Sequence, residues 1–378
     1  MIPSASTADA ARTPQGAAPY RVLLCDDSAA VRGAMMRILS AEPDIDVVGS
    51  VPNGQAAVEH VRRHEVEVVV LDIEMPVMDG MTALPLILTA RPSVRVVMAS
   101  TLTRRNAAIS IKALTLGATD YVSKPDAGGI HGSAAFGQEL VGKIRAIAQG
   151  ARARRARHPA GSPAKPAVAA ATAAPVTLAL RPRPIQLPRL LAIGTSTGGP
   201  QALDVLLGII GPSVNVPIVI VQHMPPTFTA LLGESLTKSS GIPCAEGRDG
   251  EPILPGRAYI APGDYHMTVE GDSSHARLRV YQAPPENFCR PAVDPMLFGI
   301  AAAYGARALA VILTGMGADG CKGAAQLVKA GGAVFAQDEA TSVVWGMPGA
   351  VAKAGLCSAV LPLTQLSNDV GAMVRART

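Results

Sequence analysis

The sequence predicts an α/β protein with two parallel-sheet domains. Short apolar runs alternate with amphipathic stretches of helical periodicity, which is the pattern of doubly wound sheets. This alternation occurs in residues 20–150 and again from residue 189, and 378 residues are enough for two domains. Only 3% of the residues are aromatic, so we expect cores built from Ala, Val, Ile and Leu.

The segment between the two patterns has the composition of a linker. Residues 151–188 are rich in Ala and Pro and contain no acidic residue. Such a segment cannot bury a core, and its prolines keep it extended. The predicted organisation is a disordered leader (1–19), a first domain (20–150), a linker (151–188) and a second domain (189–378).

The positive charge is concentrated in that linker. The formal net charge is +5, but residues 151–189 hold eight Lys and Arg, without which it would be −3. A basic tether for nucleic acid or for an acidic partner is the alternative to a plain linker. No aromatic residue is interleaved there for base stacking, so we expect no nucleic-acid partner.

The remaining composition indicates a cytoplasmic protein. No apolar run reaches the ~18 residues that a membrane span needs, so we expect no membrane insertion. The first residues lack the basic and apolar regions of a signal peptide. The five cysteines show no C-x-x-C spacing, which fits a reducing compartment and argues against a zinc site.

The first domain predicts five strands that alternate with helices. RVLLC (21–25) is a strand, and SAAVRGAMMRILS (28–40) is a helix with Ser28 as its N-cap. Further strands are expected at DVVGS, EVVVLD, RVVMAS and DYVSK, each followed by a helical pattern. This order predicts a doubly wound five-stranded parallel sheet, which binds ligands beyond the carboxyl ends of its strands.

Polar residues stand at these strand ends: Asp26 and Asp27 after the first, Asp72 at the third, Ser100 at the fourth and Lys124 at the fifth. Packed carboxylates repel one another unless a cation lies among them, and Mg²⁺ leaves room for phosphate oxygens. Such a site would let an aspartate attack a phosphoryl donor. Helix capping is the alternative, but it does not explain the whole set.

Residues 21–148 resemble a response-regulator receiver domain. The resemblance implies that Asp72 is phosphorylated by a chemotaxis histidine kinase and that Lys124 contacts the phosphoryl group. It also implies that Ser100 and Tyr121 form a switch pair and that the Lys124–Pro125 bond is cis. The implied Mg²⁺ ligands are Asp26, Asp27, Asp72 and, through its main-chain carbonyl, Glu74.

The second domain predicts another α/β sheet. Strands are expected at LLAIG, VPIVIVQH (216–223), ALAVIL (308–313), AVFAQ and LCSAVLPL, with helices at 200–210, FTALLGESLTK and VDPMLFGIAAAYG. Turn signals at DGEPILPG and APGD indicate a β-rich insertion. We therefore expect a Rossmann-like α/β/α domain with a β-hairpin insertion.

A candidate nucleophile lies after the first of these strands. Gly194, Ser196 and Gly198 match G-x-S-x-G, whose glycines permit a tight turn that exposes the serine. The following helix would place main-chain N–H groups beside a developing oxyanion. The motif alone is equally compatible with a plain turn, and it lacks the pattern of a P-loop or a dinucleotide site.

A serine nucleophile needs a base and an orienting acid. His223 ends a strand at the same expected sheet edge, whereas His266 and His275 lie in the insertion and in a polar turn. A core histidine is the alternative. Asp319, in TGMGADG, follows another apolar strand, and its rival Asp294 opens a helix that it is expected to cap.

Residues 190–376 resemble the catalytic domain of chemotaxis protein-glutamate methylesterases, through GTSTGGP, QHMPPTFT, RPAVDPML, ILTGMGADG and WGMP. The resemblance implies a Ser196–His223–Asp319 triad, an oxyanion site at the main-chain N–H groups of Thr197 and Met316, and no cofactor for the esterase. It further implies demethylation and deamidation of chemoreceptor helices, under a receiver that covers the active site until it is phosphorylated.

Three departures from the family pattern are small, and we expect none of them to touch the triad: Thr195 stands where Ala is usual, Cys289 where a histidine often precedes Arg-Pro, and Trp345 where Phe is common. Two other classes of function stay open at this point. A signalling module with an inactive second domain conflicts with the complete Ser, His and Asp set. A DNA-binding response regulator would need a helix-turn-helix, which the sequence does not show.

Overall fold

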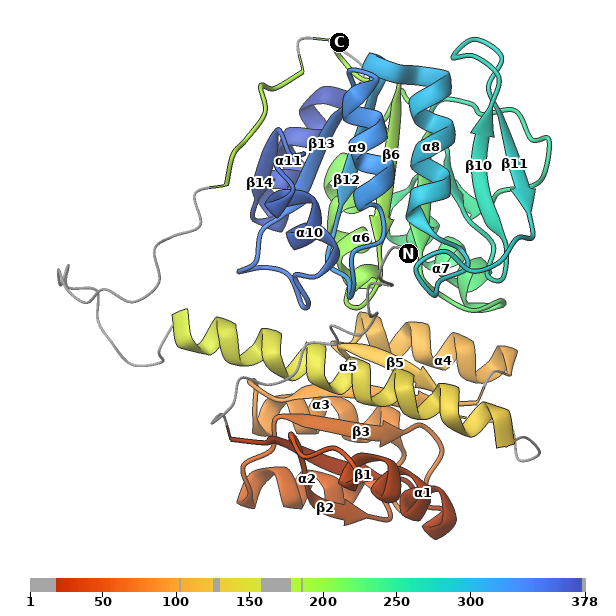
Figure 1. The fold of residues 1–378 in the computed structure, drawn as a ribbon. Helices are drawn as coiled ribbons and strands as arrows, with labels where there is room; N and C mark the ends of the chain where they lie inside the picture. Colours follow the sequence, from red (N-terminus) through yellow and green to blue (C-terminus); the bar gives the residue numbers. More distant parts are fainter. Residues whose placement is uncertain (1–17, 102, 125–129, 158–177, 185, 376–378) are drawn as a thin grey trace, which may run out of the picture. The chain divides into compact units, whose positions relative to one another are not determined.

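The computed structural model describes residues 18–101, 103–124, 130–157, 178–184 and 186–375. The described chain forms two compact units, built on strands β1–β5 and on strands β6–β14 (Figure 1). Most of the leader expected at 1–19 and of the linker expected at 151–188 lies outside the described residues. In the part that is described, no helix combines the length and the apolar character needed to cross a membrane.

The first unit contains a five-stranded parallel sheet in the order β2-β1-β3-β4-β5. Its strands are β1 (Tyr20–Cys25), β2 (Ile45–Val51), β3 (Val68–Asp72), β4 (Arg95–Ser100) and β5 (Asp120–Ser123). The helices that follow these strands are α1 (Ala29–Ser40), α2 (Gly54–Arg63), α3 (Gly80–Ala90), α4 (Arg104–Thr115) and α5 (Ile130–Arg157). By its contacts, α4 is grouped with the second unit.

Local sequence explains these elements. The central strand β3 is buried along its whole length, and its Val-rich run is what a sheet covered on both faces requires. Ser28 caps α1 by accepting a hydrogen bond from the Val31 N–H, as predicted. Asn53 and Asp79 cap α2 and α3 in the same way.

The second unit contains a seven-stranded parallel sheet in the order β14-β13-β12-β6-β7-β9-β8. Its strands are β6 (Leu190–Thr195), β7 (Ile218–Gln222), β8 (Cys244–Glu246), β9 (Ala258–Ile260), β12 (Ala308–Ile312), β13 (Ala333–Gln337) and β14 (Ala359–Leu361). Its helices are α6 (Gly199–Ile210), α7 (Phe228–Ser240), α8 (Val293–Tyr304), α9 (Cys321–Lys329), α10 (Met347–Lys353) and α11 (Leu363–Val374).

The predicted fold class is confirmed, with one refinement in the insertion. Only β10 (His266–Glu270) and β11 (Arg277–Tyr281) form a separate antiparallel hairpin. The other two strands of this region, β8 and β9, pair in parallel with the main sheet and extend it beyond β7. The β-rich region therefore both lengthens the sheet and adds a hairpin to it.

The order of the main sheet reverses between β6 and β12. Gly194 of β6 pairs with Ile312 of β12 and with Val221 of β7, so these three strands end side by side. In open parallel sheets such a reversal leaves a crevice beyond the carboxyl ends of the strands. The segments that follow β6, β7 and β12 therefore meet at one place.

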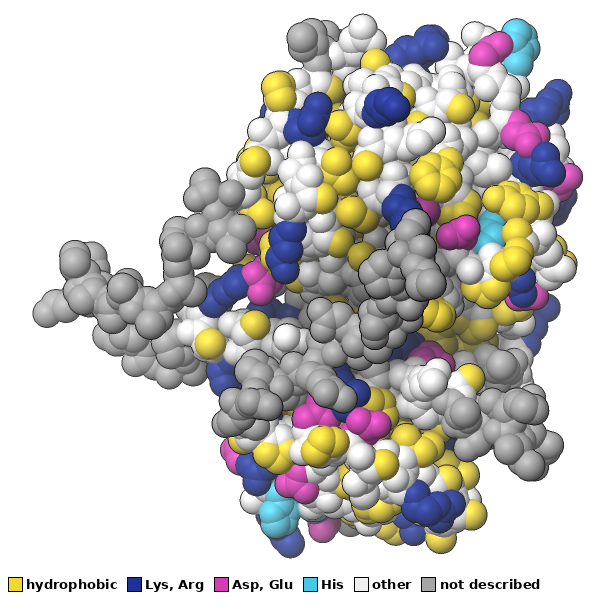
Figure 2. Space-filling view, in the orientation of Figure 1, with side chains coloured by type: hydrophobic (Ala, Val, Ile, Leu, Met, Phe, Trp, Pro, Cys, Tyr) yellow, Lys and Arg dark blue, Asp and Glu magenta, His cyan; other side chains and the backbone are white. Residues whose placement is uncertain are grey.

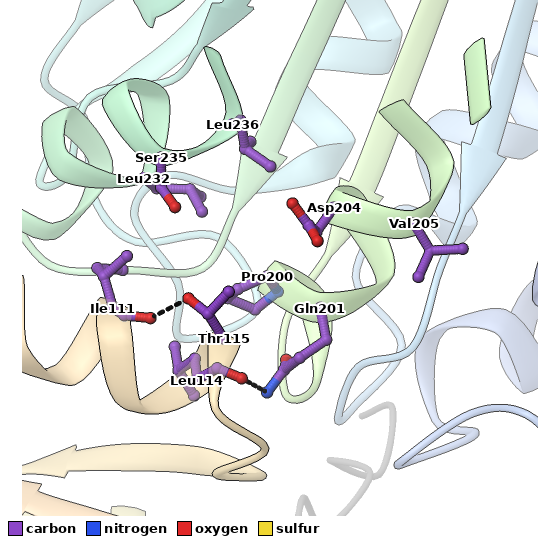
Figure 3. Close-up of a pocket in the computed structure, with 10 residues that line it drawn as sticks. All are labelled: Ile111, Leu114, Thr115, Pro200, Gln201, Asp204, Val205, Leu232, Ser235 and Leu236. Atoms are coloured by element: carbon purple, nitrogen blue, oxygen red, sulfur yellow. Dashed lines mark hydrogen bonds between the residues drawn. The ribbon is translucent and has the colours of Figure 1, made fainter. Parts of the chain in front are cut away.

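Helix α6 is anchored where it leaves this edge. Figure 3 shows Pro200 in its first turn and the side chains of Leu232 and Leu236 projecting from α7. Both leucines are buried, and α6 packs against α7 and α11. Pro200 has no N–H to lose at this position, so it favours the helix start that follows the turn.

The visible surface is mixed in character. In Figure 2, Lys and Arg side chains lie apart from one another, with apolar, acidic and neutral polar atoms between them. This pattern is that of an ordinary solvated surface. It agrees with the 17% charged content of the chain.

Candidate functional site

The first candidate site lies at the carboxyl edge of the β1–β5 sheet. Asp26 follows β1 and Asp72 ends β3, and these two strands are neighbours. One carboxylate oxygen from each of Asp26, Asp27 and Asp72 lies within 4.8 Å of the other two. Asp26 and Asp72 are buried and Asp27 is exposed, so the cluster is open to solvent on one side.

Lys124 lies against two of these carboxylates. Its Nζ is 2.6 Å from Asp26 Oδ2 and 2.6 Å from Asp72 Oδ1. Burial raises the pKa of Asp72, and the contact with Lys124 only partly offsets this effect. Burial would lower the pKa of Lys124, but the two aspartates outweigh it and raise that pKa, so the ammonium stays charged.

The donor set fits a small divalent cation. Three carboxylates face one ammonium, which leaves two negative charges in a partly buried site. Mg²⁺ prefers oxygen ligands of this kind and keeps several water molecules. Asp26, Asp27 and Asp72 could hold it, while the main-chain carbonyl of Glu74, two residues after Asp72, stays a prediction.

The two expected switch residues lie on adjacent strands. Ser100 ends β4, and its carbonyl accepts a hydrogen bond of 2.7 Å from the Lys124 N–H, which places it beside the cluster. The ring of Tyr121 is buried, which raises its pKa, and Lys143 Nζ lies 4.8 Å from the ring centre. The predicted cis bond at Lys124–Pro125 falls on Pro125, outside the described residues.

The second candidate site lies where the order of the β6–β14 sheet reverses. Ser196 directly follows β6, and its N–H donates to Thr314 O at 3.0 Å. The turn needs its glycines: Gly198 has a φ of 76°, and a Cβ on Gly199 would lie 2.0 Å from Gln222 Oε1. The turn is therefore held closely against the neighbouring strands, with Ser196 at its start.

The loop after β12 reaches the same serine. A Cβ on Gly315 would lie 2.9 Å from Ser196 Cβ, so only glycine permits this approach. Among the described residues, neither the Thr197 N–H nor the Met316 N–H donates to another group. Neither N–H therefore has a partner that a ligand oxygen would have to displace, and their role as an oxyanion site stays a prediction.

His223 and Asp319 form a direct pair. His223 follows β7 and Asp319 lies in the loop after β12, and His223 Nε2 is 2.8 Å from Asp319 Oδ2. Burial of His223 would lower its pKa, but the hydrogen bond to Asp319 and the contact with Cys289 outweigh this and raise it to about 10.

Asp319 is surrounded by hydrogen-bond donors. Burial would raise its pKa, but the bond from His223 and the main-chain donors outweigh burial and lower it, so the carboxylate is ionised. Besides His223, the donors are the N–H groups of Val293 (2.6 Å), Asp294 (3.2 Å) and Gly320 (2.9 Å), and the Asn287 side-chain amide (2.8 Å).

The structure brings to this site two residues that the sequence did not place there, Asn287 and Cys289, both in the turn of residues 286–289. The expectation that Cys289 does not touch the triad is wrong, because its sulfur lies against His223. Glu286 and Cys289 exchange main-chain hydrogen bonds, and Asn287 and Phe288 have φ values of 51° and 65°. Positive φ at both central positions is characteristic of a type I′ turn. Asn tolerates this conformation, whereas Phe288 is strained and fully exposed.

Two side chains of this turn contact the His223–Asp319 pair. Asn287 Nδ2 donates to Asp319 Oδ1 at 2.8 Å and to Asp294 Oδ2 at 3.0 Å, so it separates two buried carboxylates. Cys289 Sγ lies 3.4 Å from His223 Nδ1. Asn between prolines and an aromatic residue indicates a turn in the sequence, but not what that turn faces.

Asp294 does not have the role that we expected. The expectation that it caps its own helix is wrong, because the N-cap of α8 is Ala292 and no side chain caps that helix. Its Oδ1 instead accepts from the Gly323 N–H of α9 at 2.7 Å. The side chain lies between two helices and Asn287, because the start of α8 packs against α9.

Gln222 is a third residue that the sequence did not place at this site. It is the last residue of β7 and is buried. Its Nε2 donates to the main-chain carbonyls of Ser196 at 3.0 Å and His223 at 3.3 Å. One amide thus fixes the backbone of both residues.

Comparison with known proteins supports the sequence resemblance. The family model described as CheB methylesterase matches residues 191–370, and the model of the response regulator receiver domain matches residues 22–131. A relative from Paramagnetospirillum magneticum, named protein-glutamate methylesterase/protein-glutamine glutaminase 1, is 54% identical over 92% of this chain and 94% of its own. The chain belongs to the CheB methylesterase family.

Other members of the CheB methylesterase family are similar over all or part of this chain. A protein-glutamate methylesterase/protein-glutamine glutaminase from Azospirillum brasilense is 50% identical over 93% of both chains. The solved catalytic domain of CheB methylesterase from Thermotoga maritima is 40% identical and covers 50% of this chain and 99% of its own, with a TM-score of 0.48. The family predicted from the sequence is confirmed.

The Asn287 amide predicts a specific effect on stability. Asn287→Gly keeps the positive φ but removes the donor between Asp294 and Asp319. We expect the free energy of unfolding at pH 7 to fall by about 1–3 kcal/mol, as it does when other hydrogen bonds to buried charged groups are lost. The loss should shrink at acidic pH, because protonation of Asp294, whose pKa burial already raises, removes the repulsion. Urea unfolding followed by Trp345, the only Trp of the chain, measures both.

Phe288→Gly is the matched control for this variant. It changes the other positive-φ residue of the turn and leaves the Asn287 amide in place. We expect it to stabilise by about 1 kcal/mol, because glycine relieves the left-handed strain. Equal stability of the two variants at pH 7 would contradict the role given to Asn287.

Proposed function

We propose that the protein is a phosphorylation-activated hydrolase of chemosensory adaptation, which removes methyl esters from γ-glutamyl side chains of chemoreceptor helices and deamidates receptor glutamines. The observation that carries the proposal is the His223–Asp319 pair of 2.8 Å at the sheet edge where Ser196 leaves β6. The names of the two relatives, protein-glutamate methylesterase/protein-glutamine glutaminase, support the substrate class.

In the proposed reaction, Ser196 Oγ attacks the ester carbonyl and His223 accepts the hydroxyl proton. Collapse of the tetrahedral intermediate breaks the bond between the carbonyl carbon and the methoxy oxygen, and His223 donates the proton to that oxygen, which leaves as methanol. Water then hydrolyses the acyl-enzyme by the same steps. A glutamine side chain would release ammonia in place of methanol.

The remaining residues have supporting roles in this proposal. The N–H groups of Thr197 and Met316 would stabilise the negative oxygen of the intermediate. Asp319, ionised and held by several donors, would stabilise the imidazolium of His223. We propose no cofactor for these steps, because an acyl-enzyme route needs only the three side chains and water.

For the first unit we propose that Asp72 accepts a phosphoryl group from a chemotaxis histidine kinase. Mg²⁺ held by Asp26, Asp27, Asp72 and the Glu74 carbonyl would supply charge neutralisation for this transfer. Lys124, already 2.6 Å from Asp72, would contact the phosphoryl oxygens. Ser100 and Tyr121 would then report the modification to the rest of the domain.

The arrangement along the chain follows from the same proposal. We propose a leader (1–19), a receiver domain (20–150), a linker (151–188) and a catalytic domain (189–378), with the unphosphorylated receiver restricting access to Ser196. The helix α5 continues to Arg157, so the first residues of the proposed linker are helical. The free cysteines among the described residues support a cytoplasmic location.

Ser196→Ala tests the nucleophile. We expect methanol release from methylated receptor membranes to fall by about 10⁴-fold or more, because triad members act as a unit. Alanine fits the same turn, so the unfolding of the domain should be unchanged. Ser274→Ala, in an exposed turn, is the control and should retain full activity. Activity of Ser196→Ala within tenfold of the wild type would exclude Ser196 as nucleophile.

Asp72→Asn tests the regulation. Asn cannot form the acyl phosphate, so acetyl phosphate should no longer stimulate methanol release, while basal activity should persist. Asp46→Asn, at an exposed position of β2, should respond like the wild type. Full stimulation of the Asp72→Asn variant would show that the phosphoryl group is accepted elsewhere.

A further inference from the structure

The thiol of Cys289 occupies the side of His223 on which a nucleophile must approach. Cys289 Sγ lies 3.4 Å from His223 Nδ1, while Nε2 is paired with Asp319. Among the described residues, the Ser196 hydroxyl makes no hydrogen bond to either ring nitrogen. The sulfur is therefore the resting partner of the nitrogen that has to accept the proton of Ser196.

The identity of that nitrogen follows from Asp319. The ionised carboxylate of Asp319 can only accept, so the proton of a neutral imidazole lies on Nε2. This leaves the lone pair on Nδ1, which faces Cys289. A thiol can donate its proton to this lone pair, and a thiolate can accept a proton from the imidazolium.

Main-chain bonds of Cys289 and side-chain bonds of its neighbour Arg290 hold the thiol in this place. The Cys289 N–H and carbonyl pair with Glu286 at 2.8 and 3.1 Å, which closes the turn. The next residue, Arg290, is tied to Asp264 Oδ1 by bonds of 3.0 and 2.5 Å and to Ala283 O at 2.7 Å. The approach of sulfur to nitrogen is thus built into the fold.

We propose that Cys289 is a positioning residue that acts through His223: its sulfur shares one proton with Nδ1 and sets the pH at which this base accepts the proton of Ser196. The inference rests on the proposed hydrolase function. It concerns a position at which this chain has a thiol, which in general is a stronger acid than the hydroxyl of a serine.

The charges around His223 agree with this role. Burial would lower the pKa of His223, while Asp319 and then Cys289 raise it, so that it reaches about 10. Burial raises the pKa of Asp294, which lies next to Asp319, and Lys322 offsets only a small part of this effect. Arg290 forms an ion pair with Asp264. Cys289 is thus the removable contribution to the pKa of His223, since Asp319 is part of the triad.

The test is the pH dependence of kcat/KM for methanol release by the full chain. In Cys289→Ala no sulfur stabilises the protonated base, so the rising limb should move to lower pH by about one unit, as expected for the loss of one nearby opposite charge. At neutral pH this is a gain of about tenfold, because the rate on the limb follows the unprotonated fraction of His223.

Cys289→Ser separates this role from packing. A serine at position 289 nearly preserves the shape of the side chain and keeps a hydrogen bond to Nδ1. If the role of Cys289 were purely structural, this variant would therefore have the pH profile of the wild type. The proposal predicts that it follows Cys289→Ala, because its hydroxyl cannot carry the charge. Cys321→Ala removes another half-buried thiol and is the control. The rising limb of its pH profile should stay at the wild-type pH.

The outcomes distinguish this inference from the function on which it rests. An active Ser196→Ala variant would overturn the hydrolase mechanism itself. An inactive Ser196→Ala variant, together with limbs of Cys289→Ala and Cys289→Ser that stay at the wild-type pH or move to higher pH, would overturn only the role of Cys289. The proposal would also be overturned if the rising limb of Cys289→Ala moved to lower pH while that of Cys289→Ser stayed at the wild-type pH.

Discussion

The hydrogen bond between Asp319 and His223 is the interaction on which the candidate catalytic site depends. It joins the loop after β12 to the end of β7, and it determines which imidazole nitrogen holds the proton. The bond is possible because the N–H groups of Val293, Asp294 and Gly320 compensate for the burial of the Asp319 carboxylate. Without them, burial would favour the neutral acid, which could not orient the base.

Both candidate sites use the same property of parallel sheets. The strands β1 and β3 bring Asp26 and Asp72 together, as β6, β7 and β12 bring Ser196, His223 and Asp319 together. Each site also buries charges and balances them locally, by Lys124 in one and by main-chain donors in the other. The difference decides the chemistry: the first site keeps excess negative charge for a cation, and the second keeps a basic nitrogen.

The strands and their end residues could be predicted because period-two and period-3.6 patterns are local, and carboxyl ends of neighbouring parallel strands must meet. The turn of residues 286–289 could not, because nothing local states that Asn287 and Cys289 face residues of two other loops. Asp294 was misjudged for a similar reason: at a helix start an aspartate usually caps, but here α9 lies close enough to donate instead. The hairpin insertion was predicted, but not that β8 and β9 continue the main sheet.

The protonation of His223 is the most direct measure of this account. In histidine labelled with ¹⁵N, the resonances of His223, assigned through a His223→Gln variant, distinguish its two nitrogens across a pH titration of the full chain. The account predicts that Nε2 keeps its proton throughout while Nδ1 titrates, and that Asp319→Asn, which adds a donor in place of the acceptor, reverses the neutral tautomer. A neutral His223 with its proton on Nδ1 in the wild type would contradict the account.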